Sequence, residues 1–235
     1  MRELYIANKN YSSWSLRPWL LMQVLAIPFE EKQVQFQSND NSAQFKIFAP
    51  NAKVPCLYHD SWVVWDSLAI VEYLAERHAG VWPEDHKARS WARSASAEMH
   101  SGFSALRSYC PFHAGGRFDK TPLPGAVQDD LKRLEQLWQE GLQRFGGPYL
   151  AGAHFSAVDA FYAPVLFRIQ SYQLPVAATV LPYIELMMSL PAMQLWYQHA
   201  LAEPFWDDEH EIAALGSGKL IKDHRLGSAN SSDVG

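Results

Sequence analysis

Residues 53–70 of the chain read KVPCLYHDSWVVWDSLAI. Two short apolar runs, Val54–Tyr58 and Trp62–Trp65, are separated by three polar residues, a pattern typical of a β-hairpin. Asp66 and Ser67 follow directly and precede apolar residues at helical spacing, as residues at a helix start do. The stretch therefore predicts two antiparallel strands followed at once by a helix.

The residues before this stretch alternate between strand-like and helix-like patterns. Leu4–Ala7 is typical of a short buried strand, and the apolar positions of Trp14–Ala26 recur at helical spacing. Glu31–Phe36 alternates like a half-exposed strand, and a short helix is expected around Phe45–Phe48. The order of elements predicts a compact α/β domain with a small mixed sheet.

Beyond Pro83 the pattern becomes helical throughout. Apolar residues three or four apart predict one long helix from about Trp91 to Cys110 and another from Val127 to Phe145, with a loop at Gly115 and Gly116 between them. Three more helices are expected at 156–171, 179–190 and 192–201.

These patterns divide the chain into three parts. Residues 1–81 form the predicted α/β domain, and residues 87–215 form an all-helical domain after a short linker. Residues 216–235 are rich in Gly, Ser, Asn and Asp, and we expect a loosely ordered tail.

Composition excludes several classes of protein. Of the 235 residues, 48% are hydrophobic and 19% are charged, which rules out a wholly disordered chain. A net charge of −5 is unlike that of nucleic-acid binders, so no nucleic-acid partner is expected. The apolar runs are too short and interrupted to span a membrane. Two cysteines and no apolar leader favour a cytoplasmic location.

Common catalytic motifs are missing from the sequence. It contains no GxGxxG, P-loop, HExxH, CxxC or GxSxG pattern. The nine histidines lack metal-ligand spacing, so we expect no metal site.

The start of the first predicted helix is one candidate site. The hydroxyls of Ser12 and Ser13 could simply cap the helix. Alternatively, the positive end of the helix dipole could stabilise a thiolate, and a serine hydroxyl that donates to the sulfur would lower the thiol pKa further.

Two further candidates lie around the hairpin, and each has a structural and a functional interpretation. Pro55 either begins a strand or follows a cis bond that turns the backbone of Val54 toward a peptide-like ligand. Asp66 and Ser67 either cap a helix or bind the ammonium and carboxylate of one ligand.

Together and in this order, these sites resemble those of the glutathione S-transferase superfamily, over roughly residues 1–205. Ser12-Ser13-Trp14-Ser15 looks like the Ser-Ser-Cys-Ser motif of its serine-type, zeta-like classes. Ala49–Pro55 is similar to the segment that leads to the family's cis-proline, and Asp66–Ile70 matches its Glu/Asp-Ser-x-Ala-Ile motif. Tyr149–Asp159 resembles the family's capping box, with Ser156 and Asp159 in its reciprocal positions.

The resemblance implies a thioredoxin-like N-terminal domain with a four-stranded mixed sheet, followed by an all-helical domain, in a zeta-like bacterial member. It implies glutathione as co-substrate, a small electrophile as second substrate, and a homodimer. Ser12 would face the glutathione sulfur, with Ser13 as the alternative. The residues expected to hold glutathione are Lys53, Val54, Pro55, Asp66 and Ser67, and those expected to line the electrophile pocket are Tyr11, Trp14, Tyr109, Phe112 and Arg117.

One residue departs from the zeta-like motif. Trp14 stands where that motif has cysteine, which argues against assuming the maleylacetoacetate isomerase activity typical of the class. Glutathione transfer to an electrophile is thus the leading prediction. A glutathione-dependent cis–trans isomerase and a non-catalytic interaction module of the same fold remain the alternatives.

Overall fold

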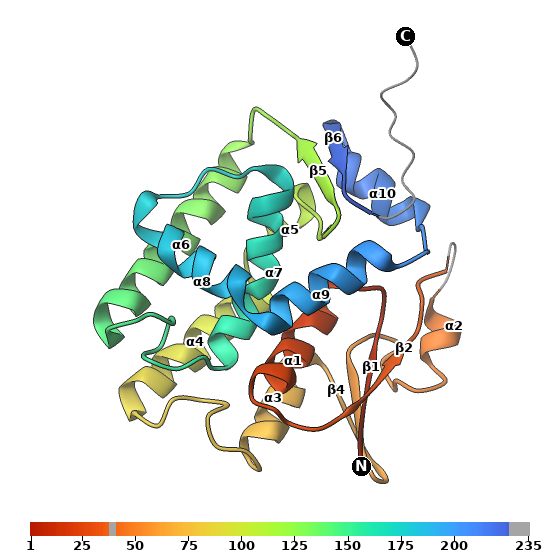
Figure 1. Ribbon diagram of the computed structural model, residues 1–235, viewed down its shortest axis with the longest axis vertical. Coiled ribbons are helices and arrows are strands. Elements are labelled where there is room, and N and C mark those ends of the chain that lie inside the picture. The colour runs from red at the N-terminus through yellow and green to blue at the C-terminus, as the bar shows by residue number, and fades with distance from the viewer. Residues whose placement is uncertain (38–40, 226–235) are drawn as a thin grey trace.

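The computed structural model describes residues 1–37 and 41–225. Its N-terminal part contains a four-stranded mixed sheet in the order β2-β1-β3-β4 (Figure 1). Strand β1 (Arg2–Ile6) pairs in parallel with β2 (Glu30–Gln33) and antiparallel with β3 (Cys56–His59). Strand β4 (Trp62–Trp65) closes the predicted hairpin with β3. The hairpin and the small mixed sheet are therefore confirmed.

Helices cover both faces of this sheet. Leu4, Ile6 and Leu57 contribute to a core shared with α1 (Ser13–Val24) and α3 (Ser67–Ala75). On the opposite face, Ala7 and Cys56 pack with the residues around α2 (Ser42–Phe45). The alternation of side chains along each strand thus separates a large core from a small one.

The C-terminal part is mostly helical, as predicted. Its first helices are α4 (His86–Ser101), α5 (Ser104–Tyr109) and α6 (Gly125–Phe145). They are followed by α7 (Ala157–Tyr172), a 3-10 turn η1 (Ala178–Val180), α8 (Leu181–Ser189), α9 (Pro191–Ala202) and α10 (Asp208–Leu215). The exact limits 1–81 and 87–215 of the two domains stay a prediction.

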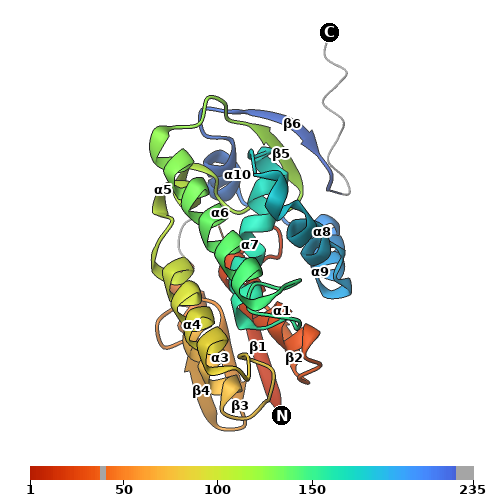
Figure 2. The same cartoon turned by 90° about the vertical axis from the view of Figure 1, so that its left-hand side faces the viewer.

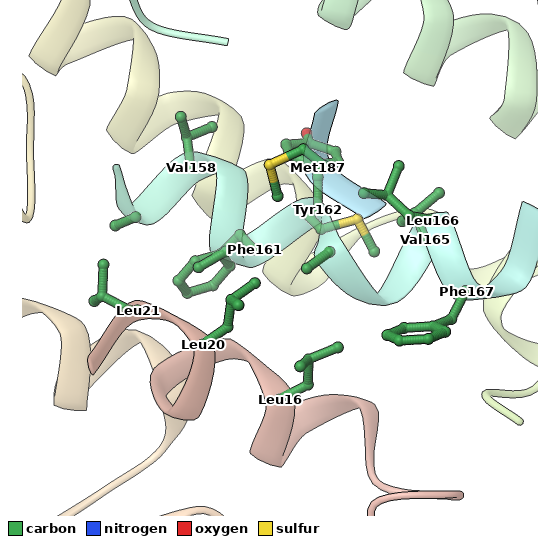
Figure 3. Close-up of a cluster of buried hydrophobic side chains, with 14 of the residues drawn as sticks. Leu16, Leu20, Leu21, Val158, Phe161, Tyr162, Val165, Leu166, Phe167 and Met187 are labelled. Carbon is green, nitrogen blue, oxygen red and sulfur yellow. The ribbon is translucent and has the colours of Figure 1, made fainter. Parts of the chain in front are cut away.

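The two halves meet where α1 packs against α7. Figure 3 shows Leu16, Leu20 and Leu21 of α1 pointing toward Phe161 and its neighbours on α7. Nearly every residue of α7 is buried, so this helix is the centre of the common core (Figure 2). Burial of a leucine or phenylalanine side chain contributes about 1.5–3 kcal/mol, so this contact fixes α1 firmly on the helical part.

The predicted long helix between residues 91 and 110 is wrong in one respect, because the chain breaks at Gly102 and Phe103. Phe103 has a left-handed backbone with φ of 54°. A Cβ atom at Gly102 would lie 2.7 Å from the carbonyl oxygen of Glu98, so the turn that separates α4 from α5 needs a glycine there.

The helical part also contains a two-stranded sheet that the sequence analysis missed (Figure 1). Strand β5 (Gly116–Asp119) pairs antiparallel with β6 (Lys219–Asp223), so Gly116 begins a strand and is not in a loop. The prediction of a loose tail is therefore wrong for the segment that includes β6. Residues 226–235 of that tail lie outside the described part of the chain.

Buried ion pairs hold this C-terminal segment in place. Arg225 pairs with Glu211 of α10 and with Asp223, and it donates a hydrogen bond of 3.0 Å to the hydroxyl of Tyr11. Burial alone would raise the pKa of Glu211, but hydrogen bonds from His113, Arg225 and Tyr11 outweigh it and lower the pKa to about 2.

Within the described ranges, no helix has the length and apolar character needed to cross a bilayer. Nor does that part of the chain hold a group of three or more His, Cys, Asp or Glu side chains arranged to bind a metal ion.

The capping box at the start of α7 is confirmed. Asp159 is fully buried, and its carboxylate accepts hydrogen bonds from the backbone N–H groups of Ser156 (2.9 Å) and Leu150 (3.0 Å). One side chain therefore fastens both the helix start and the preceding loop.

Asp159→Ala should lower the free energy of unfolding by about 2–4 kcal/mol, because it leaves two buried N–H groups without acceptors. Chemical denaturation measures the change. Asp85→Ala is the matched control: Asp85 caps α4 from an exposed position through Lys87 and Ala88, so its removal should cost about 1 kcal/mol. Equal losses for the two variants would contradict this assignment.

Candidate functional site

A cleft of about 610 Å³ opens between the sheet domain and the helical domain. Its walls come from the α1 start, the segments around α2 and β3, α5, the loop after α5, α7 and α10. The lining residues are Tyr11, Ser12, Ser13, Trp14, Phe36, Asn41, Phe45, Ala52, Lys53, Val54, Ser104, Arg107, Ser108, Pro111, Phe112, Arg168 and His210.

Ser12 lies at the N-cap position of α1, at the wall of this cleft, with 4% of its surface exposed. Its side chain makes no capping hydrogen bond, so capping does not account for a serine at this position. The Ser12 hydroxyl instead lies 2.7 Å from the buried hydroxyl of Ser15. Ser15 in turn accepts a hydrogen bond of 3.2 Å from the backbone N–H of Ala7.

Ser13 is the first residue of α1 and also lines the cleft, where it is partly exposed. The first backbone N–H groups of a helix have no partner within the helix and carry the positive end of its dipole. Neither Ser12 nor Ser13 is followed by an acidic residue in the first turn of α1. This corner of the cleft is therefore suited to an anion.

Val54 and Lys53 line the wall opposite the helical domain. The bond between Val54 and Pro55 is cis, and β3 begins only at Cys56. No backbone hydrogen bond joins Val54 to another described residue. Its backbone is thus available to an extended peptide-like ligand. Lys53 is exposed beside it.

Asp66 caps α3 by accepting hydrogen bonds from the N–H groups of Leu68 (2.8 Å) and Ala69 (3.3 Å). Its backbone has a positive φ of 76°, a strained conformation of the kind that clusters at active sites and ligand clamps. Capping uses only one carboxylate oxygen, Oδ1. The other oxygen lies 3.4 Å from Nε2 of His100.

Several buried polar atoms beside Asp66 have no hydrogen-bond partner among the described residues. They include the hydroxyl of Ser67, Nδ1 of His100, and Nε and Nη1 of Arg17. Unpaired buried polar atoms are costly and uncommon in folded proteins. Asp66 and Ser67 do not line the cleft themselves, but His100 packs edge-on against Trp14, which does.

Three of the five predicted pocket residues line the cleft: Tyr11, Trp14 and Phe112. The Tyr11 hydroxyl donates to Glu211 at 2.5 Å, and burial raises its pKa, so its proton is engaged away from any ligand.

Tyr109 and Arg117 are not among the lining residues. The Tyr109 hydroxyl donates to the carbonyl of Lys120, and Arg117 donates to the hydroxyl of Tyr197. The unpredicted β5–β6 sheet explains both placements. Arg117 lies within β5, and Lys120, the partner of Tyr109, is the first residue after this strand.

Sequence reasoning missed the C-terminal wall of the cleft. His210 of α10 is stacked on both Tyr11 and Phe36, with ring centroids 5.0 and 4.7 Å apart. Its Nδ1 also forms a short hydrogen bond with Asp207. This wall depends on α10 folding back over the first domain, which no local pattern indicates.

Two arginines of the helical wall were missed as well. Arg107 of α5 and Arg168 of α7 line the cleft, and Arg168 is only 4% exposed. The signal for Arg168 was present, because it is the one charged residue in the apolar run from Phe161 to Ile169.

Family comparisons agree with this architecture. The family model for the glutathione S-transferase N-terminal domain matches residues 11–77, and that for the C-terminal domain matches residues 122–199. Together they cover more than half of the chain.

Curated relatives align along most of the chain. A probable maleylacetoacetate isomerase from Caenorhabditis elegans is 28% identical over 201 residues, 80% of this chain and 89% of that protein. The maleylacetoacetate isomerase of Rattus norvegicus is 24% identical and covers 86% of this chain and 93% of its own length.

Solved structures share the fold. A glutathione transferase homologue from Burkholderia with bound glutathione has a TM-score of 0.62 at 24% identity, over 85% of this chain and 97% of its own. A diazinon-metabolizing glutathione S-transferase from Bombyx mori has a TM-score of 0.69 at 18% identity, with the same coverage. The two-domain architecture, the family models and these relatives agree, and the chain belongs to the glutathione S-transferase superfamily.

Proposed function

We propose that the protein is a glutathione transferase that ionises the thiol of bound glutathione at the start of α1 and directs the thiolate at a small electrophile in the cleft. The observation that carries this proposal is the Ser12 hydroxyl. It opens on the cleft at a helix N-terminus, is not used for capping, and is held by a second buried hydroxyl.

The pair of hydroxyls favours donation to the sulfur. Ser15 already accepts a hydrogen bond from Ala7, so it can give its own proton to Ser12. Ser12 then keeps its proton for the sulfur, and a hydroxyl that accepts a hydrogen bond is a better donor. Such a bond favours the thiolate and lowers the pKa of the thiol.

The rest of glutathione has partners on the sheet domain, first at the cleft wall and then, outside the cleft lining, at the start of α3. The backbone of Val54, beside the cis bond to Pro55, would pair with the cysteinyl residue, and Lys53 with the glycine carboxylate. The unpaired hydroxyl of Ser67 would bind the γ-glutamyl carboxylate, and the exposed side of Asp66 its ammonium group. A ligand there would satisfy the buried atoms that have no partner among the described residues.

Glutathione-dependent isomerisation is the second candidate. It is favoured by the names of the C. elegans and R. norvegicus relatives, each of which aligns over at least 80% of this chain. Trp14 replaces the cysteine of the zeta-like motif at the cleft wall, which favours transfer. Turnover of a cis-configured dienoic substrate without net consumption of glutathione would favour isomerisation instead.

Isothermal titration calorimetry with glutathione tests the binding site. Ser67→Ala should weaken binding about tenfold or more, because it removes a hydrogen bond to a charged group. Ser94→Ala, which removes a surface hydroxyl bonded to the Ser90 carbonyl, should leave the affinity unchanged. Absence of binding by the unmodified protein at millimolar glutathione would favour a non-catalytic interaction module.

Titration of the thiolate absorbance of bound glutathione tests the role of Ser12. Ser12→Ala should raise the pKa of the bound thiol by about 1–2 units, since a hydrogen bond to a charged acceptor is worth about 1.5–3 kcal/mol. Conjugation near neutral pH should slow accordingly, because less thiolate is present.

Ser13→Ala is the matched control and should shift this pKa less. A larger shift for Ser13→Ala would exchange the two roles, and no shift for either variant would mean that the serine assignment is wrong.

We further propose that two copies pair through the outer face of β4 and α3, and that the protein works in a reducing cytoplasm, where its two buried cysteines stay free. Trp62 and Trp65 are 65% and 43% exposed, and both line a hollow there together with Val64 and Leu68. Large exposed apolar patches typically mark interfaces.

Sedimentation velocity should give a dimer for the unmodified protein and a monomer for Trp62→Asp, which places a charge in the apolar interface. Ile212→Asp alters an equally exposed apolar residue on α10 and should remain dimeric. A monomeric parent protein, or a dimeric Trp62→Asp variant, would contradict this interface.

A further inference from the structure

The charge of the cleft is unlike that of the chain. The protein carries a net charge of −5, yet the described residues that line the cleft include Lys53, Arg107 and Arg168 and not one aspartate or glutamate. A concave, partly buried site with one sign of charge concentrates ligands of the opposite sign.

The two cleft arginines are fixed by carbonyl groups and not by acids. Arg168 donates from Nε to the carbonyl of Cys110 at 2.8 Å, and Arg107 donates to the carbonyls of His100 and Gly102 at 3.2 and 3.3 Å. Neither arginine has an ion pair with any residue in the described ranges. A buried cation without a counter-ion is costly, and an anionic ligand would supply the missing partner.

A third guanidinium adds to the positive field. Arg17 is buried behind Trp14, with its Cζ 4.2 Å from the ring centroid, and Arg107 contacts the same ring at 4.6 Å. Burial and then repulsion from Arg107 and Arg168 lower the pKa of Arg17 to about 9. Burial also lowers the pKa of Arg168, to about 10, and that of Arg107.

Glutathione does not account for Arg107 and Arg168. In the proposed function its groups lie along the sheet domain, from Ser12 past Val54 and Lys53 to Ser67. The two arginines project from α5 and α7 on the helical wall. Ser104 lies three residues before Arg107, on the same face of α5, and it lines the cleft together with Ser108. Phe112 adds an apolar surface, with Arg168 Cζ 5.7 Å from its ring centroid.

We propose that Arg107 and Arg168 form a carboxylate-binding subsite for the second substrate, so that the preferred electrophile of this protein is an organic anion with an apolar body. This inference rests on the proposed glutathione transferase function and specifies its substrate class. Fork-shaped guanidinium groups suit a planar carboxylate because they donate two parallel hydrogen bonds to it.

A matched pair of electrophiles tests the subsite: 4-(bromomethyl)benzoate and its neutral carboxamide, 4-(bromomethyl)benzamide. In both, the thiolate of glutathione forms a C–S bond to the benzylic carbon and bromide leaves with the bonding electrons. We expect kcat/KM for the carboxylate to exceed that for the carboxamide by about tenfold or more, after correction for the uncatalysed rates.

Arg107→Gln should abolish this preference through a raised KM for the carboxylate, while the affinity for glutathione stays unchanged. Arg107→Lys should keep part of the preference, because lysine retains the positive charge but lacks the two parallel donors of the guanidinium group. Arg144→Gln, which removes a surface arginine paired with Glu140, is the control and should keep the full preference. Arg107 is preferred to Arg168 as the test position because it is less buried, and circular dichroism verifies the fold of each variant.

The outcomes separate this inference from the proposed function. Equal turnover of both electrophiles by the unmodified protein would overturn the subsite and leave the transferase function standing. So would an Arg107→Gln variant that binds glutathione more weakly but keeps the preference, since the arginines would then serve glutathione. Absence of glutathione binding and of turnover with either electrophile would overturn both.

Discussion

The packing of α1 against α7 is the constraint on which the rest of the structure depends. Residues Ser15–Met22 of α1 are all buried, between the sheet on one side and α7 on the other. A helix held on all sides cannot shift without opening the core. The first turn of α1 is therefore held in one position at the cleft. The packing of leucines and phenylalanines between α1 and α7 thus fixes where the serine hydroxyls lie (Figure 3).

The same packing brings positive charge to the cleft. Arg17 follows Leu16 on α1, Arg168 follows Phe167 on α7, and Arg107 enters from α5. Arg107 and Arg168 line the cleft, and Arg17 lies against the ring of Trp14, which lines it as well. A buried cation without an acidic partner lowers the stability of the fold, and such costs are typically found at functional sites. A glutathione thiolate and a carboxylate substrate are both anions that this field would favour.

Local patterns in the sequence predicted those parts of the fold that local chemistry decides. The hairpin at residues 53–65, the cap at Asp66 and the reciprocal box at Ser156 and Asp159 each depend on a few neighbouring residues. The break at Gly102 was missed because the apolar period continues through it, and only a close approach to the Glu98 carbonyl reveals the turn.

Parts of the site that depend on contacts between segments far apart in the sequence could not be predicted from local patterns. Strand β6 is paired with β5, which lies about a hundred residues earlier in the chain. That pairing removes Arg117 from the cleft and, with α10, brings His210 into it. The hydroxyl bond between Ser12 and Ser15 could have been suspected from their spacing of three, but its burial could not.

A crystal structure of the protein with glutathione tests the central claim most directly, namely that the helix start and the Ser12 hydroxyl stabilise the thiolate. The account predicts the sulfur within about 3.5 Å of Ser12 Oγ, with Ser15 still bonded to Ser12 and the γ-glutamyl group at Ser67. A sulfur beyond hydrogen-bond distance of both Ser12 and Ser13, or a tripeptide bound away from the start of α1, would contradict it.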